Sequence, residues 1–346
     1  MTESNDLAGR TMVVTGATSG LGLETCRQIA RRGGATVVLV DRDQDRIDAV
    51  IAELSESADR DRLNSALADL SSLDRARKLS EELLHRFPRI DVLVNNAGIA
   101  WGRRQLTVDG IEEMFAVNYL APFVLATSLA PAMAAASTAD AAGYRHPARI
   151  VDVSSSGHRG GHLDFDDLDG TKDTFHGQRA YNNSTLALTL FTRELARRSD
   201  PARLVVNCAD PGFVRGTSLG RGLLFGHQVV GTLLTPFRAD VAKAAETVVW
   251  TATATESGKF TGEYVKGCKV VHPSKDARDA ELAARLWDAT EALLAGRGAA
   301  RPLTPVSSDP RRATARCRAD PGTTLRGCRP GHARPHARPD PSPGTR

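Results

Sequence analysis

The chain has 346 residues, 41% of them hydrophobic and 25% charged, with a formal net charge of +4. These proportions are typical of a soluble globular protein with one large domain or two of modest size. Residues 301–346 hold ten arginines and three acidic residues, a net charge of +7, which leaves residues 1–300 with a net charge of −3. A slightly acidic body argues against nucleic-acid binding as the main task.

The sequence shows none of the patterns expected for export or for a membrane span. Residues 1–6 are polar and acidic, unlike the basic and then apolar start of a signal peptide. The longest apolar stretch, residues 120–136, contains two prolines and many alanines, which favours a buried helix. The five cysteines form no CxxC pair, as is typical of reduced thiols. We therefore expect a cytoplasmic protein without a membrane span.

Apolar runs alternate with helical patterns along the first 300 residues. The runs are short and β-branched, which is typical of strands buried on both faces of a parallel sheet. They lie at residues 12–14, 36–40, 92–94, 150–153, 204–207 and 263–266. Helical patterns lie at residues 20–32, 43–57, 73–86, 107–136, 178–198, 239–254 and 276–295. This alternation predicts a doubly wound parallel sheet, an α/β Rossmann fold, as a single domain over residues 1–300. Residues 301–346, rich in Arg and Pro, are expected to form a disordered tail.

A glycine-rich turn follows the first expected strand, where the chain reads Gly16-Ala17-Thr18-Ser19-Gly20-Leu21-Gly22. Gly16 permits a tight turn, Gly20 lets the backbone approach a pyrophosphate, and Gly22 lets the helix pack close to the sheet. The helix N-terminus offers free N–H groups and a positive dipole end to phosphates. Because a strand precedes it and a helix follows, the turn, with Ser19 and Leu21 on either side of Gly20, is predicted to bind a dinucleotide.

The second expected strand ends at Asp41 and Arg42. An acidic residue at this place hydrogen-bonds the adenosine ribose and repels a 2′-phosphate, so Asp41 favours NAD. Arg42 either pairs with a 2′-phosphate or is a solvated surface charge. The sequence therefore favours NAD as the cofactor, with NADP as the alternative.

Three further segments follow in order: Asn95-Asn96-Ala97-Gly98 and Ser154-Ser155 each end a strand, and Tyr181 opens a helix. With the glycine turn, they resemble the short-chain dehydrogenase/reductase family over residues 11–270. The finer similarity, to the branch that includes the retinol dehydrogenases, rests on residues 150–158 and 186–191. The resemblance implies an NAD(P)-dependent oxidoreductase that moves a hydride between a nicotinamide cofactor and an alcohol or carbonyl.

The resemblance also assigns roles to individual residues. Tyr181 is the expected acid/base, Ser155 the residue that polarises the substrate oxygen, and Asn118 the residue that kinks its helix and holds a water of the proton relay. Hydride transfer at a carbinol carbon requires a proton to enter or leave its oxygen, and a phenol has the reach for this. The positions implied to line the cofactor are Asp69, Leu70, Asn95, Ala97, Gly98, Tyr181, Thr185, Pro211, Gly212, Val214 and Thr217.

One position departs from the family pattern. The family has a lysine one helical turn after the tyrosine, and this chain has Thr185. A cation there lowers the pKa of the tyrosine, whose free value of ~10 is too high for a base at neutral pH. The family lysine also grips the nicotinamide ribose, which Thr185 reaches only through water. Lys172 and Arg179 are the candidate substitute cations. Two hypotheses follow: an oxidoreductase with impaired activity, or a catalytically dead dinucleotide-binding pseudoenzyme with a regulatory or structural role.

The expected partner is a small-molecule alcohol or carbonyl, with a lipophilic character suggested by apolar residues in the loops that would wall its pocket. These loops are residues 156–175 and 215–238. No nucleic-acid partner is expected, whereas homo-oligomers are common in the family. No metal site is expected either, because glycines between His158 and His162 disfavour a helix and no third ligand is evident.

Overall fold

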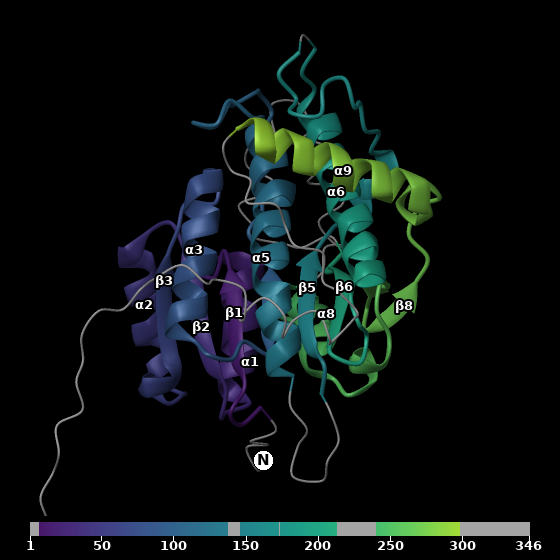
Figure 1. Cartoon of the computed structure of the whole chain (residues 1–346). Coiled ribbons are helices and arrows are strands. Elements are labelled where there is room, and N and C mark those ends of the chain that lie inside the picture. Colours follow the sequence, from purple (N-terminus) through teal and green to yellow (C-terminus); the bar gives the residue numbers. More distant parts are fainter. Residues whose placement is uncertain (1–6, 138–145, 173, 213–239, 298–346) are drawn as a thin grey trace, which may run out of the picture. The chain divides into compact units, whose positions relative to one another are not determined.

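The computed structural model describes residues 7–137, 146–172, 174–212 and 240–297. They form an eight-stranded sheet with the order β3-β2-β1-β4-β5-β6-β7-β8 (Figure 1). The strands are β1 (Thr11–Thr15), β2 (Thr36–Asp41), β3 (Leu63–Leu67), β4 (Val92–Asn95), β5 (Ala148–Val153), β6 (Leu204–Asp210), β7 (Tyr264–Lys266) and β8 (Lys269–Val271). All neighbours run parallel except β7 and β8, which are antiparallel. The predicted doubly wound fold is confirmed.

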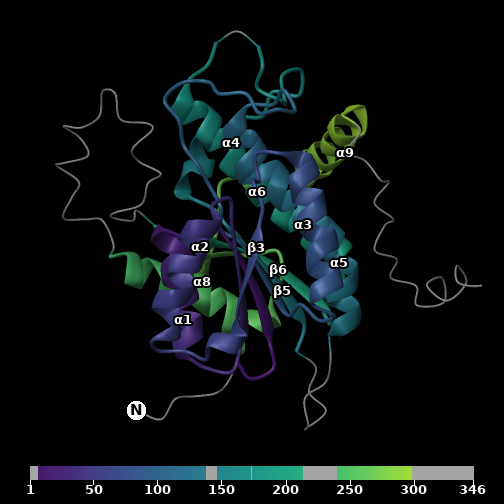
Figure 2. The same ribbon diagram turned by 90° about the vertical axis from the view of Figure 1, so that its left-hand side faces the viewer.

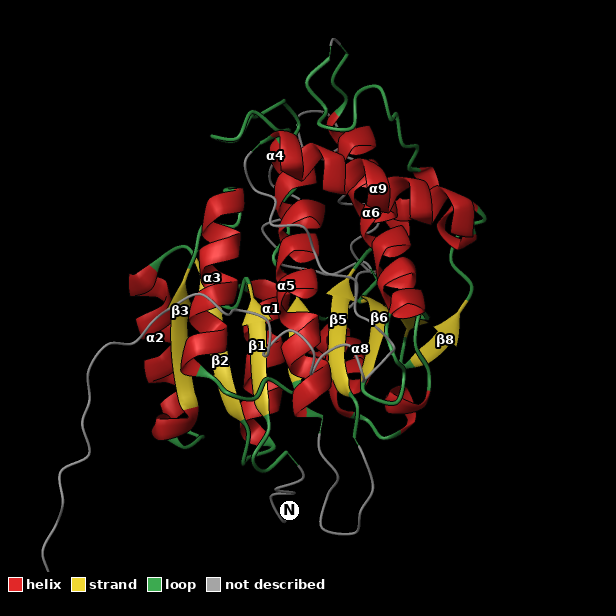
Figure 3. Cartoon of the chain, in the orientation of Figure 1, coloured by secondary structure: helices red, strands yellow, loops and turns green. Residues whose placement is uncertain are grey.

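Helices cover both faces of this sheet (Figure 2). The helices on one face are α1 (Gly20–Arg31), α2 (Gln44–Ser55) and α8 (Val241–Thr253). Those on the other are α3 (Leu73–Arg86), α5 (Ala121–Ala136) and α6 (Gly177–Arg198). The last described helix, α9 (Ala280–Gly296), lies beside α6 (Figure 3). Its Trp287 contacts the rings of Phe123 on α5 and Phe191 on α6. Short 3-10 turns are η1 (Arg60–Arg62), η3 (Ser156–Gly160), η6 (Glu256–Lys259) and η7 (Asp276–Arg278).

The central strands are apolar throughout because both of their faces are buried. Val13 and Val38 belong to the hydrophobic core on the α3, α5 and α6 side. Met12, Val14 and Val37 belong to the core on the α1, α2 and α8 side. Successive side chains of a strand point to opposite faces, so a strand between two helical layers needs an apolar residue at each position.

The helix predicted over residues 107–136 is wrong in its first part. Residues 107–112 form a loop, and the helical segment starts with α4 (Glu113–Phe115), followed by a π-helical turn, η2 (Ala116–Leu120), and then α5. Glu112 is the N-cap residue, since its carboxylate accepts two backbone N–H groups of α4. A side chain that caps the first turn fixes where the helix begins, which hydrophobic periodicity does not reveal.

The apolar runs of the sequence did not predict two strands that lie at the edges of the sheet. β3 reads LNSAL and has two partly exposed polar positions, while β8 has three residues, none of them fully buried. An edge strand pairs on one side only and needs fewer apolar residues, so its sequence signal is weak. The predicted end of the domain at residue 300 and the disorder of residues 301–346 concern residues outside the described ranges and stay predictions.

One described helical segment, Glu113–Ala136, is long and apolar enough to cross a membrane by length and composition alone. Of its apolar 18-residue window, 67% is buried inside the protein, where α5 packs between the sheet and its neighbouring helices. The core helices of soluble proteins have the same properties, so this finding gives only weak support to a membrane span.

Candidate active site

The residues assigned to the cofactor and to catalysis lie along one edge of the sheet. Strands β1 to β6 run parallel, so the segments that follow them share the carboxyl edge, where doubly wound proteins bind their ligands. The assigned residues of these segments are Gly16 to Gly22, Asp41, Arg42, Asp69, Leu70, Asn95 to Gly98, Ser155, Pro211 and Gly212. Val214 and Thr217, which were also assigned, lie outside the described residues.

The glycine turn leaves no room for a side chain at Gly16 or Gly22. Gly16 and Gly20 have φ values of +66° and +53°, in the left-handed region that favours glycine. A Cβ on Gly22 would lie 2.2 Å from the carbonyl oxygen of Gly16. Ser19 is the N-cap of α1 but makes no side-chain cap bond, so the first N–H groups of the helix remain open to a ligand. Leu21 is buried in the core. The turn therefore fits a diphosphate.

Asp41 connects the end of β2 to the glycine turn. Its Oδ2 accepts a hydrogen bond of 2.7 Å from Thr18 Oγ1, and its Oδ1 accepts one of 2.8 Å from the N–H of Arg42. The carboxylate is thus held beside the turn, where the adenosine ribose of a dinucleotide would lie. Arg42 is exposed.

The two positions after β3 differ in their surroundings. Asp69 is exposed, and its carboxylate accepts a hydrogen bond of 3.0 Å from the N–H of Ser71. Leu70 is buried in the core on the α3 side. Asp69 is therefore the more accessible of the two to an adenine.

The segment after β4 connects three strands. Asn95 is buried, and its Nδ2 donates a hydrogen bond of 2.8 Å to Asp152 Oδ1 on β5. The N–H groups of Asn96 and Ala97 each donate a bond of 3.0 Å to Thr15 Oγ1 on β1. Gly98, the next residue, is half-buried. These bonds fix the backbone beside the glycine turn.

Asn118 lies in the π-helical turn and connects it to α6. Its Oδ1 accepts the N–H of Ile99 at 2.8 Å, and its Nδ2 donates to the Ile99 carbonyl at 2.9 Å and to Ser184 Oγ at 3.0 Å. Ser184 Oγ in turn donates to the carbonyl of Tyr181 at 2.8 Å. π-Helical turns are frequent at functional sites. This one holds the backbone of Tyr181 through a chain of side-chain hydrogen bonds.

Ser155 and Tyr181 meet, although they lie on different elements. Ser155 follows β5 and caps η3, and its hydroxyl is close enough to the Tyr181 phenol to lower the pKa of that phenol. Gly157 makes room for the ring, because a Cβ there would lie 3.2 Å from Tyr181 Cε1. Burial raises the pKa of Tyr181, the neighbouring Ser155 hydroxyl lowers it, and the charge of Asp210 raises it, with a net upward shift. No cation among the described residues contributes to this balance.

Thr185 does not replace a lysine chemically. Its side chain is buried, and its Oγ1 donates a hydrogen bond of 2.9 Å to the carbonyl of Asn182 in the same helix. An uncharged hydroxyl that is already bonded to its own helix does not lower the pKa of the Tyr181 phenol.

The two substitute cations suggested by the sequence have other partners. Lys172 is exposed, and its Nζ donates to the carbonyl of Asp166. Arg179 is exposed, and its guanidinium donates to the carbonyl of Thr174 at 2.7 Å. Within the described part of the chain both side chains are hydrogen-bonded away from the Tyr181 phenol, so neither takes the lysine's place in this structure.

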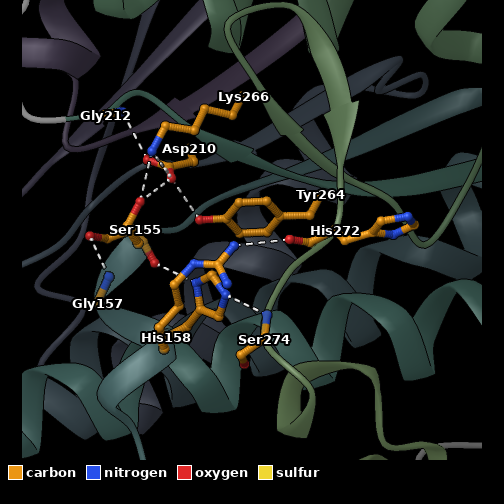
Figure 4. A network of polar contacts seen from close by, with 11 residues as sticks. Ser155, Gly157, His158, Asp210, Gly212, Tyr264, Lys266, His272 and Ser274 are labelled. Carbon is orange, nitrogen blue, oxygen red and sulfur yellow. Dashed lines mark hydrogen bonds and ion pairs between the residues drawn. The ribbon is translucent and has the colours of Figure 1, made fainter.

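Sequence reasoning missed Asp210, the last residue of β6 (Figure 4). This buried carboxylate accepts hydrogen bonds through Oδ2 from Ser156 Oγ at 2.7 Å, Tyr264 OH at 2.9 Å and Lys266 Nζ at 3.1 Å. Its Oδ1 accepts the N–H of Gly212 at 2.8 Å. Burial raises the pKa of Asp210, but these donors outweigh it and the net shift is downward. An acid at the end of an otherwise buried strand is the signal that the sequence offered.

His158 is a buried structural residue at the same edge. Its Nε2 accepts the N–H of Ser274 at 3.0 Å, and its Nδ1 lies 2.8 Å from the carbonyl oxygen of Ser155. This arrangement assigns the proton to Nδ1 of a neutral imidazole, and burial lowers the pKa of His158. Within the described residues, no group of three His, Cys, Asp or Glu side chains is placed to hold a metal ion.

A family model described as short chain dehydrogenase matches residues 10–223. The chain belongs to the short-chain dehydrogenase family. It is 34% identical over 295 residues to human retinol dehydrogenase 13, covering 84% of this chain and 86% of that protein. It is 38% identical over 293 residues to a proposed daunorubicin C-13 ketoreductase, DnrU, of Streptomyces sp. strain C5, covering 85% and 95%.

A solved structure is also similar to this short-chain dehydrogenase. It is that of an uncharacterized protein from Mycobacterium paratuberculosis, with a TM-score of 0.65 and 31% identity, covering 83% of this chain and 94% of that one. Together these similarities confirm the retinol-dehydrogenase-like branch expected from the sequence. The protein is thus an oxidoreductase with a nicotinamide cofactor and a small-molecule substrate.

Proposed function

We propose that this short-chain dehydrogenase uses NAD to interconvert a lipophilic alcohol and its carbonyl compound, with turnover slowed by Thr185. The observation that carries the proposal is that Ser155 lies beside Tyr181 while no cation among the described residues lowers the pKa of this phenol. The bound nicotinamide supplies the hydride chemistry. Tyr181 moves the proton at the substrate oxygen, and Ser155 polarises that oxygen.

The direction of the Tyr181 pKa shift supports slow turnover. Alcohol oxidation needs the phenolate of Tyr181 as a base, and burial keeps the phenol protonated at neutral pH. Carbonyl reduction starts from the protonated phenol and so does not need prior ionisation. The site is therefore better suited to reduction than to oxidation near pH 7.

Asp41 supports NAD as the preferred nucleotide. Its carboxylate is fixed by Thr18 of the glycine turn, where it would bond the ribose hydroxyls and repel a 2′-phosphate. The exposed Arg42 beside it supports NADP as the alternative.

The names of the relatives support a lipophilic substrate. Retinol and daunorubicin, named for two similar proteins, are an apolar alcohol and a ketone on a fused-ring skeleton. One of the two loops expected to wall the substrate pocket, residues 215–238, lies outside the described ranges, so the proposal stays at the level of this substrate class.

A second hypothesis, a dinucleotide-binding pseudoenzyme, follows from the same observation. Thr185 removes the tuning cation, while the glycine turn keeps its open helix N-terminus. In this case the protein binds the cofactor without turnover and acts as a regulatory or structural component.

Thr185→Lys decides between the two hypotheses, with Thr185→Met as a control of similar length without charge. The lysine should increase the rate of all-trans-retinal reduction or retinol oxidation by about 10- to 1000-fold, because general acid–base catalysis is worth ~10²–10⁴-fold. The native chain should show a slow measurable rate, and a complete lack of turnover would favour the pseudoenzyme. Equal rates for all three proteins would refute the impairment.

Cofactor binding is measured separately through the melting temperature. NADH should raise it in the native protein by mass action, whether or not the substrate is the right one. If neither NADH nor NADPH raises it, both hypotheses fail.

A further inference from the structure

Two loops that follow the carboxyl ends of β4 and β5 lie side by side. The first, residues 104–112, precedes α4, and the second, residues 161–172, lies between η3 and α6. The N–H of Glu112 donates a hydrogen bond of 2.8 Å to the carbonyl of Asp169, and a Cβ on Gly170 would lie 2.8 Å from the Glu112 Cβ. Figure 2 shows both loops at the top of the view, above α4. We call them the 104–112 loop and the 161–172 loop.

Both ends of the 161–172 loop lead to the catalytic helix. At its start, a Cβ on Gly161 would lie 2.6 Å from the carbonyl oxygen of Asn182, the residue after Tyr181. Beyond its end, the chain enters α6 at Gly177, one helical turn before Tyr181. Loops at the carboxyl ends of strands line the ligand crevice of a doubly wound fold. We therefore expect the 161–172 loop to form a wall of the substrate site beside the phenol.

Arg297, the C-cap residue of α9, is bonded to both loops at once. Its Nη2 donates a hydrogen bond of 2.7 Å to Asp169 Oδ2 in the 161–172 loop, and its Nε donates one of 3.0 Å to the carbonyl of Asp109 in the 104–112 loop. The side chains of the ion pair are 25% and 24% exposed, so the pair is partly shielded from water. A guanidinium presents several donors in one plane, which suits it to hold acceptors from two segments.

We propose that Arg297 is a substrate-positioning residue, which holds the 104–112 and 161–172 loops together and thereby sets how tightly the site binds its substrate. The inference rests on the proposed function and extends it, because it assigns control of substrate affinity to the last described helix, α9. Arg297 acts through the two loops, and the proton transfer stays with Tyr181.

A second arginine of α9 contacts the same loop. The guanidinium carbon of Arg285 lies 3.9 Å from the centre of the Phe165 ring, and Phe165 packs against the hydrophobic core. α9 is itself held on the catalytic helix α6 through Trp287, whose ring stacks on that of Phe191 with 5.9 Å between the ring centres. α9 is thus a support from which two cations reach the 161–172 loop.

The 104–112 loop also holds the 161–172 loop directly. The guanidinium of Arg104 donates a hydrogen bond of 3.0 Å to the carbonyl of Thr171 and another to the carbonyl of Lys172. The 161–172 loop has four aspartates and one lysine, so its negative charge attracts the neighbouring guanidinium groups. Among these contacts, the bonds of Arg297 are the ones that join α9 to both loops.

The test removes the ion pair in steps. Arg297→Met removes the positive charge and keeps an unbranched side chain, and Asp169→Asn removes the negative charge. The double variant shows whether the two residues act as a pair. Arg278→Met, at an exposed arginine before α9, is the control for the loss of one positive charge. Because the pair is partly exposed, all four proteins should fold, and their melting temperatures check this.

Hydrogen–deuterium exchange measures the two loops directly and needs neither cofactor nor substrate. Arg297→Met and Asp169→Asn should each raise the exchange rate of the amides in both loops by about 3- to 10-fold, as for the loss of a partly exposed ion pair and its hydrogen bonds. The double variant should exchange no faster than the single variants, and Arg278→Met should match the native protein. Native exchange rates in both loops of Arg297→Met would overturn the inference.

Steady-state kinetics with all-trans-retinal decide whether the loops set substrate affinity, and they are measured in the Thr185→Lys background, where rates are easier to follow. Arg297→Met should raise the KM for retinal by about 3- to 10-fold and change kcat and NADH affinity by less than about 2-fold. A merely structural role would lower kcat, NADH affinity and the melting temperature together and would overturn the inference. Faster exchange with an unchanged KM would also overturn it.

The proposed function and the role of Arg297 fail separately. If NADH does not bind, or if neither the native chain nor Thr185→Lys turns over a carbonyl substrate, the proposed function is refuted, and the exchange rates still decide whether Arg297 holds the loops. If Thr185→Lys reduces retinal with the same KM in the presence and absence of Arg297, the inference alone is refuted.

Discussion

Thr185 and Asn182 are joined by a hydrogen bond in which the threonine Oγ1 donates to the asparagine carbonyl at 2.9 Å. The only polar atom of the Thr185 side chain therefore points back into its own helix and not toward the Tyr181 phenol. The site therefore has the side chains needed for proton transfer, but Thr185 supplies no positive charge to lower the pKa of Tyr181. This relationship also determines which substitutions should change the rate and which should change only binding or stability.

Tyr181→Phe should abolish most of the remaining turnover and keep cofactor binding. The phenol is the group placed to move the proton, and its removal leaves the glycine turn intact. In the Thr185→Lys protein, where rates are easier to measure, we expect a loss of about 100-fold or more. The rate is measured with retinal and the binding by NADH fluorescence. A Tyr181→Phe protein that keeps its rate would place the acid elsewhere.

Asp41→Asn should change the choice of nucleotide. Removal of the charge takes away the repulsion of a 2′-phosphate while the side chain still accepts the Thr18 hydroxyl. The ratio of NADPH to NADH affinity should rise by about 10-fold, since one charge interaction near a protein surface is worth ~1 kcal/mol or more. Asp45→Asn, an exposed site in the first turn of α2, is the control and should leave the ratio unchanged.

Gly22→Ala should disrupt the glycine turn. The added Cβ would lie 2.2 Å from the carbonyl oxygen of Gly16, so the helix must move away from the strand. We expect loss of NADH binding and a fall in stability of about 1–3 kcal/mol, as for other overpacked sites. Gly296→Ala near the end of α9 is the matched control, because a Cβ there meets nothing within 4 Å. Unaltered binding in Gly22→Ala would contradict the assigned diphosphate site.

Ser184→Ala should weaken the support of the catalytic helix. The variant loses the bond to the Tyr181 carbonyl and leaves Asn118 Nδ2 with one partner fewer. The free energy of unfolding should fall by about 1–3 kcal/mol, the range for a buried hydrogen bond left partly unsatisfied. Urea titration measures this change. A free energy of unfolding equal to the native value would show that the hydrogen bonds of Ser184 to Asn118 and Tyr181 do not stabilise the protein.

Asp152→Asn should stabilise the protein at neutral pH. The side chain is fully buried, and burial raises its pKa to about 6, against the bonds from Asn95 and Thr192 that lower it. The pKa of Asp152 in the folded state is above its unfolded value of ~3.9, so between these two values the folded state binds more protons than the unfolded state. The stabilisation that comes from this proton binding is present at low pH and is lost as the pH rises through about 6.

The amide has no charge to bury, so the gain for Asp152→Asn should be about 1–3 kcal/mol at pH 8 and should shrink toward zero near pH 4. Thr192 Oγ1 also donates to the Leu188 carbonyl, which leaves it able to accept from the new amide. Urea unfolding at both pH values measures the difference. A gain of equal size at the two pH values would contradict the titration of Asp152.

The sequence by itself determined the local features of this protein. The glycine turn, the buried strands and the helix α6 that carries Tyr181 each depend on residues close together in the chain, whose spacing sets backbone conformation and burial. The replacement of the lysine by Thr185 was also visible there, since one helical turn fixes which side chains share a face.

The tertiary structure decided which distant side chains meet. Asp210, Ser156 and Lys266 are separated by up to 110 residues in the sequence. Their side chains meet because β5, β6 and β7 are neighbours in the sheet. It also showed that Lys172 and Arg179 bond to other segments, and that residues 107–112 precede the helix because Glu112 caps it. Local periodicity carries no information on such contacts, because they arise from how the strands are ordered and packed.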